Sequence, residues 1–393
     1  MRAEFLPFAP PLIGEEEIEE VAQTLREGWI TTGPRAQRFE SDFKAYVGAA
    51  AALAVNSATS AMHIALAAIG VGEGDAVITT TMTFVSTLHV IEHMRARPVL
   101  VDVEADTLNI DPEQVEAAIR RTPRVKAIMP VHLYGHPADM DAIYDIAHRH
   151  GVAVIEDAAH ALAARHKGRM IGAPKPGFDQ PNLVAFSFYA TKNLTTGEGG
   201  MLTGPPDLID EARVWSLHGM SRDAFKRYTS DGSWRYDVVL PGFKYNMPDI
   251  QAAIGLRQLR RLDSMQKRRR AIVAQYDEAL GGLPELERPV ERPDVASAWH
   301  IYPLRLNLDR LRIGRDAFIQ NLRDLNIGTS VHFIPAHEFS YYRDRHHFKT
   351  DDFPVAHREF ERMLSLPLSP AHTDQDVADV IEAVSEVVTK NRA

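Results

Sequence analysis

Residues 183–200 read LVAFSFYATKNLTTGEGG and contain three kinds of segment in a row. The apolar run LVAFSF is typical of a buried strand, a short polar bend follows it, and a glycine-rich stretch follows the bend. The bend holds a single lysine, Lys192. Because lysine is rarely buried, its position directly after a buried strand raises the question of what it binds.

Outward from this stretch, strand-like and helix-like segments alternate along the chain. The apolar runs typical of strands are residues 51–55, 76–80, 98–103, 126–131, 152–157 and 183–188. Amphipathic segments typical of helices lie between several of them, at residues 60–71, 84–96, 112–121 and 139–151. The alternation and the nearly continuous apolar strands predict an α/β domain whose mostly parallel sheet is buried on both faces.

The pattern changes after Asn246. Residues 248–280 are predicted to form one long helix with Pro248 near its start, where proline is tolerated. Its charge run RRLDSMQKRRR is expected to be a solvated face. Strand and helix patterns then mix. We therefore expect a large domain at residues 1–255 and a smaller C-terminal α+β domain at residues 256–393, with the long helix bridging the two.

Composition excludes several classes of protein. The 393 residues carry a formal net charge of −9, which argues against a nucleic-acid partner. There is no cysteine, so thiolate chemistry is excluded. The acidic N-terminus lacks a secretory signal and no run is long enough to span a membrane, so we expect a cytoplasmic protein. The histidines at 148–150 and 346–347 lack a ligand framework, so no metal site is expected.

Three strand ends carry residues that could bind a ligand, because ligands of open α/β sheets lie outside the carboxyl ends of the strands. In VNSATSAMHIAL (55–66), a small polar turn opens a helix. Free N–H groups there, with the hydroxyls of Thr59 and Ser60, would bind an anion. Simple N-capping is an equal alternative.

The second strand end is VIEDAAHALAA (154–164), where Asp157 precedes a helix-like run. Asp157 is either an N-cap or a buried carboxylate that faces a cation. His160 would lie on the same side if a helix begins here, although a histidine among alanines is more commonly a core residue. The third strand end is followed by Lys192. A desolvated lysine is a Schiff-base nucleophile, and pyridoxal phosphate enzymes combine one with an acid at the pyridine nitrogen and a phosphate site.

With these motifs the chain resembles the DegT/DnrJ/EryC1/StrS family of sugar aminotransferases, which have pyridoxal phosphate fold type I. The resemblance covers nearly the whole chain. It includes GWITTGPRAQRFE, NSATSAMHIAL, TFVST, VHLYGHPADMDAI, VIEDAAHA, FSFYATKNLTTGEGG, GFKYNMPDIQAAIGLRQL, HIYPLRL, VHFIPAH and LSLPLSPAHTDQDV. LHGMSRDAFKRY followed by PGFKYNMPDIQAAIGL is most similar to the ArnB-type branch, which transaminates a UDP-4-keto-pentose.

The resemblance implies a role for particular residues. Lys192 matches the lysine that bonds the cofactor, and Asp157 matches the acid at the pyridine nitrogen. The remaining cofactor residues are Ala58, Thr59, Ser60 and Ser187 at the phosphate, Phe84 stacked on the ring, His160 toward the 3-hydroxyl oxygen, and Asn246 at the phosphate of a neighbouring subunit. Phe84 has an alternative role as a core residue on a helix. The family usually has glutamine at position 160, often glycine at 58 and proline at 190, but neither alanine removes a functional group.

The resemblance also implies a function. L-Glutamate would donate its amino group to pyridoxal phosphate, and a nucleotide-linked keto-sugar, most simply a 4-keto-sugar, would accept it in a ping-pong reaction of a homodimer with shared sites. Thr32 and His332 are expected at the sugar, and the Arg-, Lys-, Trp- and Tyr-rich stretch 220–245 suits a diphosphate and a stacked base. The alternatives are a keto-cyclitol acceptor, and a regulatory protein that binds the cofactor without catalysis; intact Lys192, Asp157 and Ser187 argue against the second.

Overall fold

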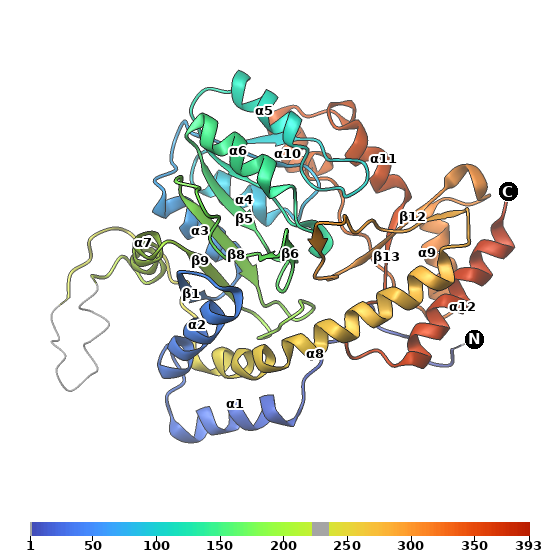
Figure 1. Ribbon diagram of the computed structural model, residues 1–393, viewed down its shortest axis with the longest axis horizontal. Coiled ribbons are helices and arrows are strands. Elements are labelled where there is room, and N and C mark those ends of the chain that lie inside the picture. The colour runs from blue at the N-terminus through green and yellow to red at the C-terminus, as the bar shows by residue number, and fades with distance from the viewer. Residues whose placement is uncertain (1, 222–235) are drawn as a thin grey trace.

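The computed structural model describes residues 2–221 and 236–393. Figure 1 shows a large sheet with helices on both faces, a long helix α8 (Asp249–Leu280) that runs from beneath it, and a smaller sheet at the end where both termini lie. This arrangement is the α/β architecture that the alternating pattern predicts. The strand positions agree with the apolar runs to within one or two residues at most ends.

The large sheet has seven strands. In spatial order they are β1 (Ala51–Val55), β9 (Gly200–Gly204), β8 (Asn182–Ser187), β5 (Ala153–Asp157), β4 (Val125–Met129), β2 (Ala76–Thr80) and β3 (Arg97–Val101). Only β9 is antiparallel to its neighbours. The carboxyl ends of β1, β5 and β8 therefore meet at one edge of the sheet.

Helices cover both faces of this sheet. Alternate residues of β1 point into different cores, since Leu53 and Val55 pack with α3 and α7 while Ala52 and Ala54 pack with α2 and α8. The helices of this part of the chain are α1 (Glu15–Glu27), α2 (Pro34–Val47), α3 (Ala58–Ala68), α4 (Ser86–His93), α5 (Pro112–Arg121), α6 (Met140–His150) and α7 (Pro206–Ser216). Burial on both faces explains why the strands are almost wholly apolar.

A smaller sheet follows α8. It has the order β10 (Leu286–Glu287), β12 (Tyr302–Leu306) and β13 (Met363–Leu366), and a short sheet combines β11 (Val295–Ala296), β6 (Arg165–His166) and β7 (Arg169–Met170). Helices α10 (Ser340–His346) and α11 (Pro354–Arg362) contribute to a core shared with Leu100 of β3 and Met363 of β13. Helices α9 (Arg315–Asp324) and α12 (Asp374–Asn391) pack with the smaller sheet. Their core also includes the last turns of α8.

Helix α8 (Asp249–Leu280) has 32 residues, and the expected boundary between residues 255 and 256 lies inside it. The division into two domains stays a prediction. The expectation of a solvated charge run was wrong for one charged residue, because Arg269 is 2 % exposed. Its Nη1 donates to the carbonyl of Leu368 at 3.0 Å and, at 3.4 Å each, to those of Trp299 and His300. These carbonyls stabilise a cation that the sequence pattern places in water.

The segment after Asp157 is also different from the expected helix. Residues 158–164 form two successive turns, with Ala161 N–H donating to the Ala158 carbonyl and Ala164 N–H to the Ala161 carbonyl. Packing against the α2 and α8 side of the sheet buries several of these alanines. Tertiary packing thus overrides the helix propensity of alanine here.

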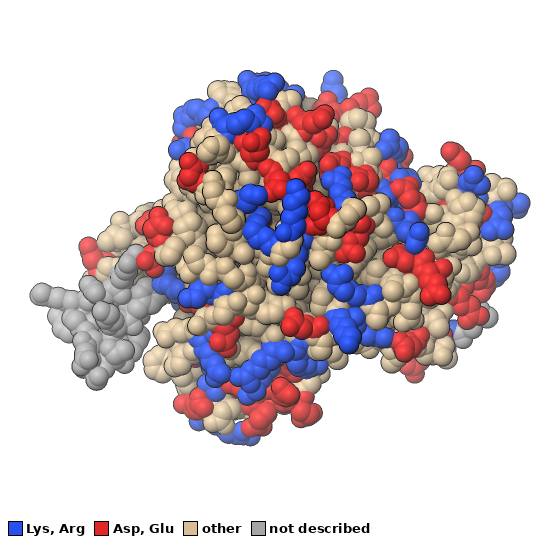
Figure 2. Space-filling model, in the orientation of Figure 1, with Lys and Arg blue, Asp and Glu red and all other residues tan. Residues whose placement is uncertain are grey.

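Charges of both signs are interspersed on the face shown in Figure 2, with no large basic patch. Among the described residues, no helix is long and apolar enough to cross a membrane. In the same part of the chain, no group of three or more histidine, aspartate and glutamate side chains is arranged to hold a metal ion.

Candidate active site

The edge formed by the strand ends brings the predicted residues together. Gly200 pairs with Val55 on one side and with Ser187 on the other. Asp157, the last residue of β5, lies beside Ala185 of β8. The three sequence motifs, which are far apart along the chain, therefore converge at one place.

Asp157 is a buried carboxylate and not a helix cap. Its side chain accepts a hydrogen bond from the Thr87 hydroxyl at 2.8 Å and another from the Ala159 N–H at 3.1 Å. Burial raises the pKa of Asp157 above its usual range, although both hydrogen bonds and the charge of Lys192 act in the opposite direction. A cation bound beside this carboxylate would offset the cost of burying its charge.

Lys192 lies in the bend after β8, where its N–H donates to the Tyr189 carbonyl at 2.9 Å. The residue as a whole is partly exposed, but protein encloses its amino group. Burial lowers the pKa of Lys192 to about 8, and the attraction of Asp157 only partly opposes this. A substantial fraction of the amine is therefore neutral near pH 7.5, as a nucleophile or a general base requires.

His160 is buried beside the lysine with a defined tautomer. The backbone N–H of Tyr134 donates to its Nδ1 at 3.2 Å, so Nε2 carries the proton of the neutral ring. Burial, and after it the charge of Lys192, holds the pKa of His160 well below its usual value. His160 can therefore donate from Nε2 toward a ligand, as the resemblance implies.

Aromatic rings continue from His160 toward the surface. The ring of Phe333 stacks on His160 with centroids 5.8 Å apart, and Phe84 lies 5.9 Å from Phe333. Phe84 is 57 % exposed and precedes α4, so the alternative of a core residue on a helix was wrong. Its ring is free to contact a ligand.

The start of α3 has the expected anion-binding geometry. The Ser60 hydroxyl, however, bonds Asn56 within the turn. The N-cap is Ser57, whose hydroxyl accepts from the Ser60 N–H at 3.1 Å. The Ser60 hydroxyl donates to Asn56 Oδ1 at 2.5 Å. Within the described chain, no residue accepts from the backbone N–H of Ala58 or Thr59. These two N–H groups remain for an anion.

Gly200 allows close backbone packing at this turn. A Cβ atom at Gly200 would lie 2.5 Å from the backbone carbon of Ser57 and 2.7 Å from the nitrogen of Ala58. Only glycine therefore lets β9 approach the start of α3 so closely. Ser187, opposite Gly200, ends β8 at the same place and its hydroxyl accepts from the Tyr189 N–H at 3.3 Å.

The other predicted residues lie in two separate places. Asn246 Nδ2 donates to the Thr32 hydroxyl at 2.6 Å, and this hydroxyl donates to the Met247 carbonyl at 2.7 Å. His332, by contrast, is on the smaller-sheet side, with Nδ1 2.9 Å from the Ser365 hydroxyl and the Phe8 ring stacked at 5.3 Å. Burial lowers the pKa of His332 to about 4, and the charge of Lys192 adds to this effect.

The predicted sugar-nucleotide segment 220–245 lies mostly outside the described residues, since only its ends, 220–221 and 236–245, are described. Sequence reasoning also did not single out two residues of the site. His300 Nε2 lies 3.4 Å from Lys192 Nζ. Tyr134 joins all three histidines, because its N–H donates to His160, its carbonyl accepts from the His300 N–H, and its hydroxyl donates to the His332 carbonyl.

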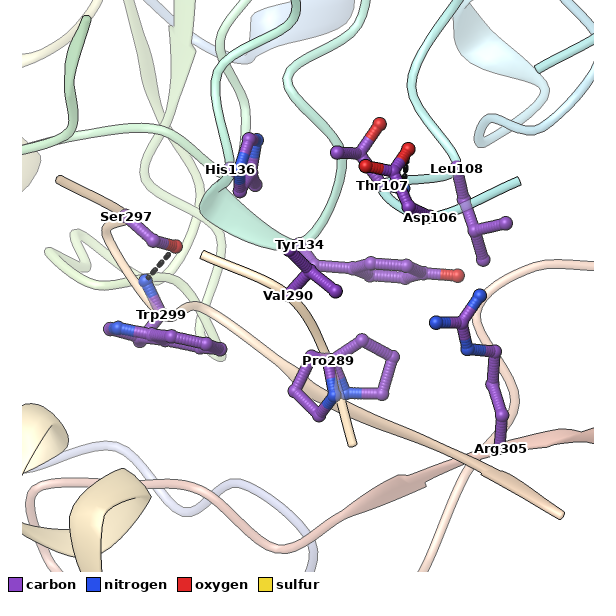
Figure 3. Close-up of a pocket in the computed structure, with 11 residues that line it drawn as sticks. Asp106, Thr107, Leu108, Tyr134, His136, Pro289, Val290, Ser297, Trp299 and Arg305 are labelled. Carbon is purple, nitrogen blue, oxygen red and sulfur yellow. Dashed lines mark hydrogen bonds between the residues drawn. The ribbon is translucent and has the colours of Figure 1, made fainter. Parts of the chain in front are cut away.

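A small pocket lies beside Tyr134. Figure 3 shows the Tyr134 ring crossing this pocket, with its hydroxyl end toward the side where Arg305 lies and Pro289 beneath it. The only signal for His300 and Tyr134 in the sequence is their position in HIYPLRL and VHLYGHPADMDAI, two motifs of the family resemblance.

These residues fit pyridoxal phosphate. The buried carboxylate suits the pyridine nitrogen, the enclosed amine suits the aldehyde carbon, and the N–H groups of Ala58 and Thr59 beside Gly200 suit the phosphate. A mostly parallel sheet with this lysine and carboxylate at its strand ends defines a pyridoxal phosphate enzyme of fold type I.

The comparisons identify the family. Residues 11–385 match the DegT/DnrJ/EryC1/StrS aminotransferase family, to which the chain therefore belongs. It is 52 % identical, over 98 % of each chain, to the spore coat polysaccharide biosynthesis protein SpsC of Bacillus subtilis.

Solved structures agree with this. A putative sugar aminotransferase of Streptococcus pneumoniae, Spr1654, is 34 % identical with a TM-score of 0.89 over 98 % of this chain and 99 % of its own, in its pyridoxal phosphate form. DesV of S. venezuelae, solved with a ketimine intermediate, is 35 % identical with a TM-score of 0.86 over 98 % and 99 % of the two chains. The protein is a pyridoxal-phosphate-dependent aminotransferase.

Proposed function

We propose that this aminotransferase moves an amino group from L-glutamate to a nucleotide-linked keto-sugar, at the 4-keto position. The observation that carries the transfer chemistry is the enclosed amine of Lys192, whose pKa is about 8, beside the buried carboxylate of Asp157. The sugar part is supported by the likeness to SpsC, named for polysaccharide biosynthesis, and to the putative sugar aminotransferase. The ArnB-type branch stays a prediction.

In this proposal each residue has a definite task. Pyridoxal phosphate, when bound, supplies an electron-accepting ring that lets a proton leave the carbon that bears the amino group. Asp157 would keep the pyridine nitrogen protonated. Lys192 would take the proton from the amino-bearing carbon and return it to C4′ of the cofactor, and would reverse this transfer for the second substrate. His160 would donate from Nε2 to the 3-hydroxyl oxygen.

The phosphate would be held at the start of α3 by the N–H groups of Ala58 and Thr59, with the hydroxyls of Thr59 and Ser187. The Ser60 hydroxyl, which bonds Asn56, would chiefly orient the turn. Phe84 would cover the ring. Contacts of His332 and Thr32 with the sugar stay predictions. Because the Thr32 hydroxyl already accepts a hydrogen bond from Asn246, Thr32 would act on the sugar through Asn246.

We also propose a homodimer in which Asn246 reaches the phosphate of the partner subunit. Within the described chain, the Asn246 side chain bonds Thr32 and Lys244, and its backbone pairs with Val55 of β1. Trp29, 43 % exposed, and Ile30, 51 % exposed, lie near Thr32 and suit an interface. Mixing inactive Lys192→Ala with weakened Asn246→Ala subunits should create hybrids with one intact site. Activity that never exceeds either parent after demonstrated subunit exchange would contradict shared sites.

The acceptor is tested by half-reactions. Enzyme converted by L-glutamate to the pyridoxamine phosphate form should regain the absorbance of the lysine-bound cofactor when a UDP- or dTDP-linked 4-keto-sugar is added. Mass spectrometry should show the matching amino-sugar nucleotide. If free keto-cyclitols restore the absorbance and every 4-keto-sugar nucleotide fails, the acceptor is a cyclitol and the proposal is wrong.

A further inference from the structure

A row of buried hydrogen bonds leads from helix α8 to the amine of Lys192. Gln266, on α8, donates from Nε2 to the Ser297 carbonyl at 3.3 Å, and its Oε1 accepts from Asn193 Nδ2 at 3.4 Å. Asn193 Oδ1 lies 3.2 Å from His300 Nδ1, and His300 Nε2 lies 3.4 Å from Lys192 Nζ. Each amide and imidazole in this row is at least nine-tenths buried.

The row defines the tautomer of His300. Asn193 Nδ2 also donates to the Ala298 carbonyl at 2.8 Å, which fixes the orientation of the amide. The oxygen of Asn193 therefore faces His300, and because an amide oxygen only accepts, His300 Nδ1 must carry the hydrogen. In the neutral ring, Nε2 then presents a lone pair to Lys192.

The surroundings keep His300 neutral. Burial holds the pKa of His300 well below its usual value, and the positive charges of Lys192 and Arg269 act in the same direction. The His160 ring is 4.4 Å away between centroids. Arg269, from α8, donates to the His300 carbonyl at 3.4 Å.

We propose that His300, oriented by Asn193, is a positioning residue that accepts a hydrogen bond from the amine of Lys192 whenever this lysine is not bonded to the cofactor. A neutral amine has two N–H groups and one lone pair. If one N–H points to His300, the lone pair points away from it. His300 would thus aim the base of the reaction without touching the substrate.

Two substitutions separate this role from a structural one. In His300→Asn, the amide reproduces the Nδ1 position and can keep the bond to Asn193, but it is too short to reach Lys192. In His300→Gln, the longer amide reproduces the Nε2 position and can accept from Lys192. Gln266→Met is the matched control, because it breaks the row at α8 and leaves the contact between His300 and Lys192 in place.

The first measurement is the pKa of Lys192 in full-length enzyme reconstituted with pyridoxamine phosphate, in which the lysine amine is free. Competitive labelling with trace acetic anhydride across pH, followed by peptide mass spectrometry, gives this pKa. We expect His300→Asn to lower it by about one unit, since a lost acceptor removes stabilisation of the charged form. His300→Gln and Gln266→Met should stay within about 0.3 units of the unchanged protein, which is small against one unit.

The second measurement is the single-turnover rate of the half-reaction with L-glutamate. We expect His300→Asn to slow it about 10- to 100-fold with little change in glutamate affinity, because a misaligned base costs this much, and His300→Gln to restore most of the rate. The inference rests on the aminotransferase chemistry. The labelling experiment uses no substrate. A negative labelling result therefore counts against the role of His300 and leaves the proposed function untouched.

An unshifted Lys192 pKa in His300→Asn would overturn the inference. So would an equal shift in Gln266→Met, because the row would then act only through packing. If His300→Asn does not fold, His300→Phe takes its place, with the same expected shift and the same refuting results.

Discussion

Replacing Asp157 with asparagine removes one charge from the site and leaves its hydrogen bonds possible. The asparagine oxygen can still accept from the Ala159 N–H, and the new NH₂ group faces the Thr87 hydroxyl. That hydroxyl lies 2.8 Å from the Thr83 hydroxyl, with either atom able to donate. Thr87 can therefore turn to donate to Thr83 and accept from asparagine, so the substitution needs no repacking.

The expected loss of activity follows from the lost charge. A carboxylate and a protonated ring nitrogen about 4 Å apart attract each other by about 4 kcal/mol at an effective dielectric constant of about 20. Since about 1.4 kcal/mol of barrier corresponds to a tenfold rate, we expect Asp157→Asn to lower kcat about 1000-fold. Single-turnover kinetics with saturating L-glutamate measure this value.

Asp157→Asn should lower kcat but should not lower the stability of the cofactor-free protein. Because burial raises the pKa of Asp157 in the folded state, the contribution of this carboxyl to stability is greatest below its ordinary pKa of 3.8 and is lost as the pH rises through the folded pKa. Asparagine has no such loss. At pH 7, cofactor-free Asp157→Asn should therefore unfold at the same temperature as the unchanged protein or a higher one.

Glu156→Gln is the matched control, one residue away and buried. Glu156 bonds His132 at 2.9 Å, Tyr144 at 2.5 Å and Asn182 at 2.9 Å. Glu156→Gln should cost about 1–3 kcal/mol of stability and leave kcat per folded protein unchanged. Near-normal kcat in Asp157→Asn, or an equal loss of kcat in Glu156→Gln, would refute the electrostatic reasoning.

Three further features are tested by substitution. Borohydride reduction should attach the cofactor to the peptide that contains Lys192, and Lys192→Ala should show neither this label nor turnover; a label on another lysine would contradict the assignment. Gly200→Ala should weaken cofactor binding at least about tenfold in a fluorescence titration and cost about 1–3 kcal/mol in urea unfolding, because its methyl group meets Ser57. Arg269→Met should cost about 1–3 kcal/mol in the same assay, whereas exposed Arg260→Met should change stability by no more than about 0.5 kcal/mol; equal effects would show that burial of Arg269 is unimportant.

Much of the fold was predictable because burial on two faces gives the strands a simple pattern. The runs at 51–55 and 76–80 coincide with β1 and β2. The antiparallel strand β9 was not predicted, because the short run in GMLTG resembles any glycine-bounded loop. The helix expected after Asp157 was wrong because alanine propensity is weak beside tertiary packing.

For the site, strand ends were informative because topology brings them to one edge of the sheet. Asp157 and the start of α3 could be located in this way. His300 could not, because it comes from a segment 108 residues after Lys192 and meets it only through the folded chain. The tautomers of His160 and His300 depend on Tyr134 and Asn193, whose hydrogen bonds have no sequence signature.

Helix α8 limits how this enzyme can be recombined with its relatives. Its first half belongs to the core beneath the large sheet, and Ile272, Tyr276 and Leu280 belong to the core of the smaller sheet. A chimera joined inside α8, for example at residue 255, would face foreign partners in one core or the other, and Gly255 itself packs on Phe39 of α2. Donor helices α1, α2 and α8 would have to be exchanged together. Transplanting the loops at the strand ends is therefore the more direct way to exchange acceptor preference between members of this family.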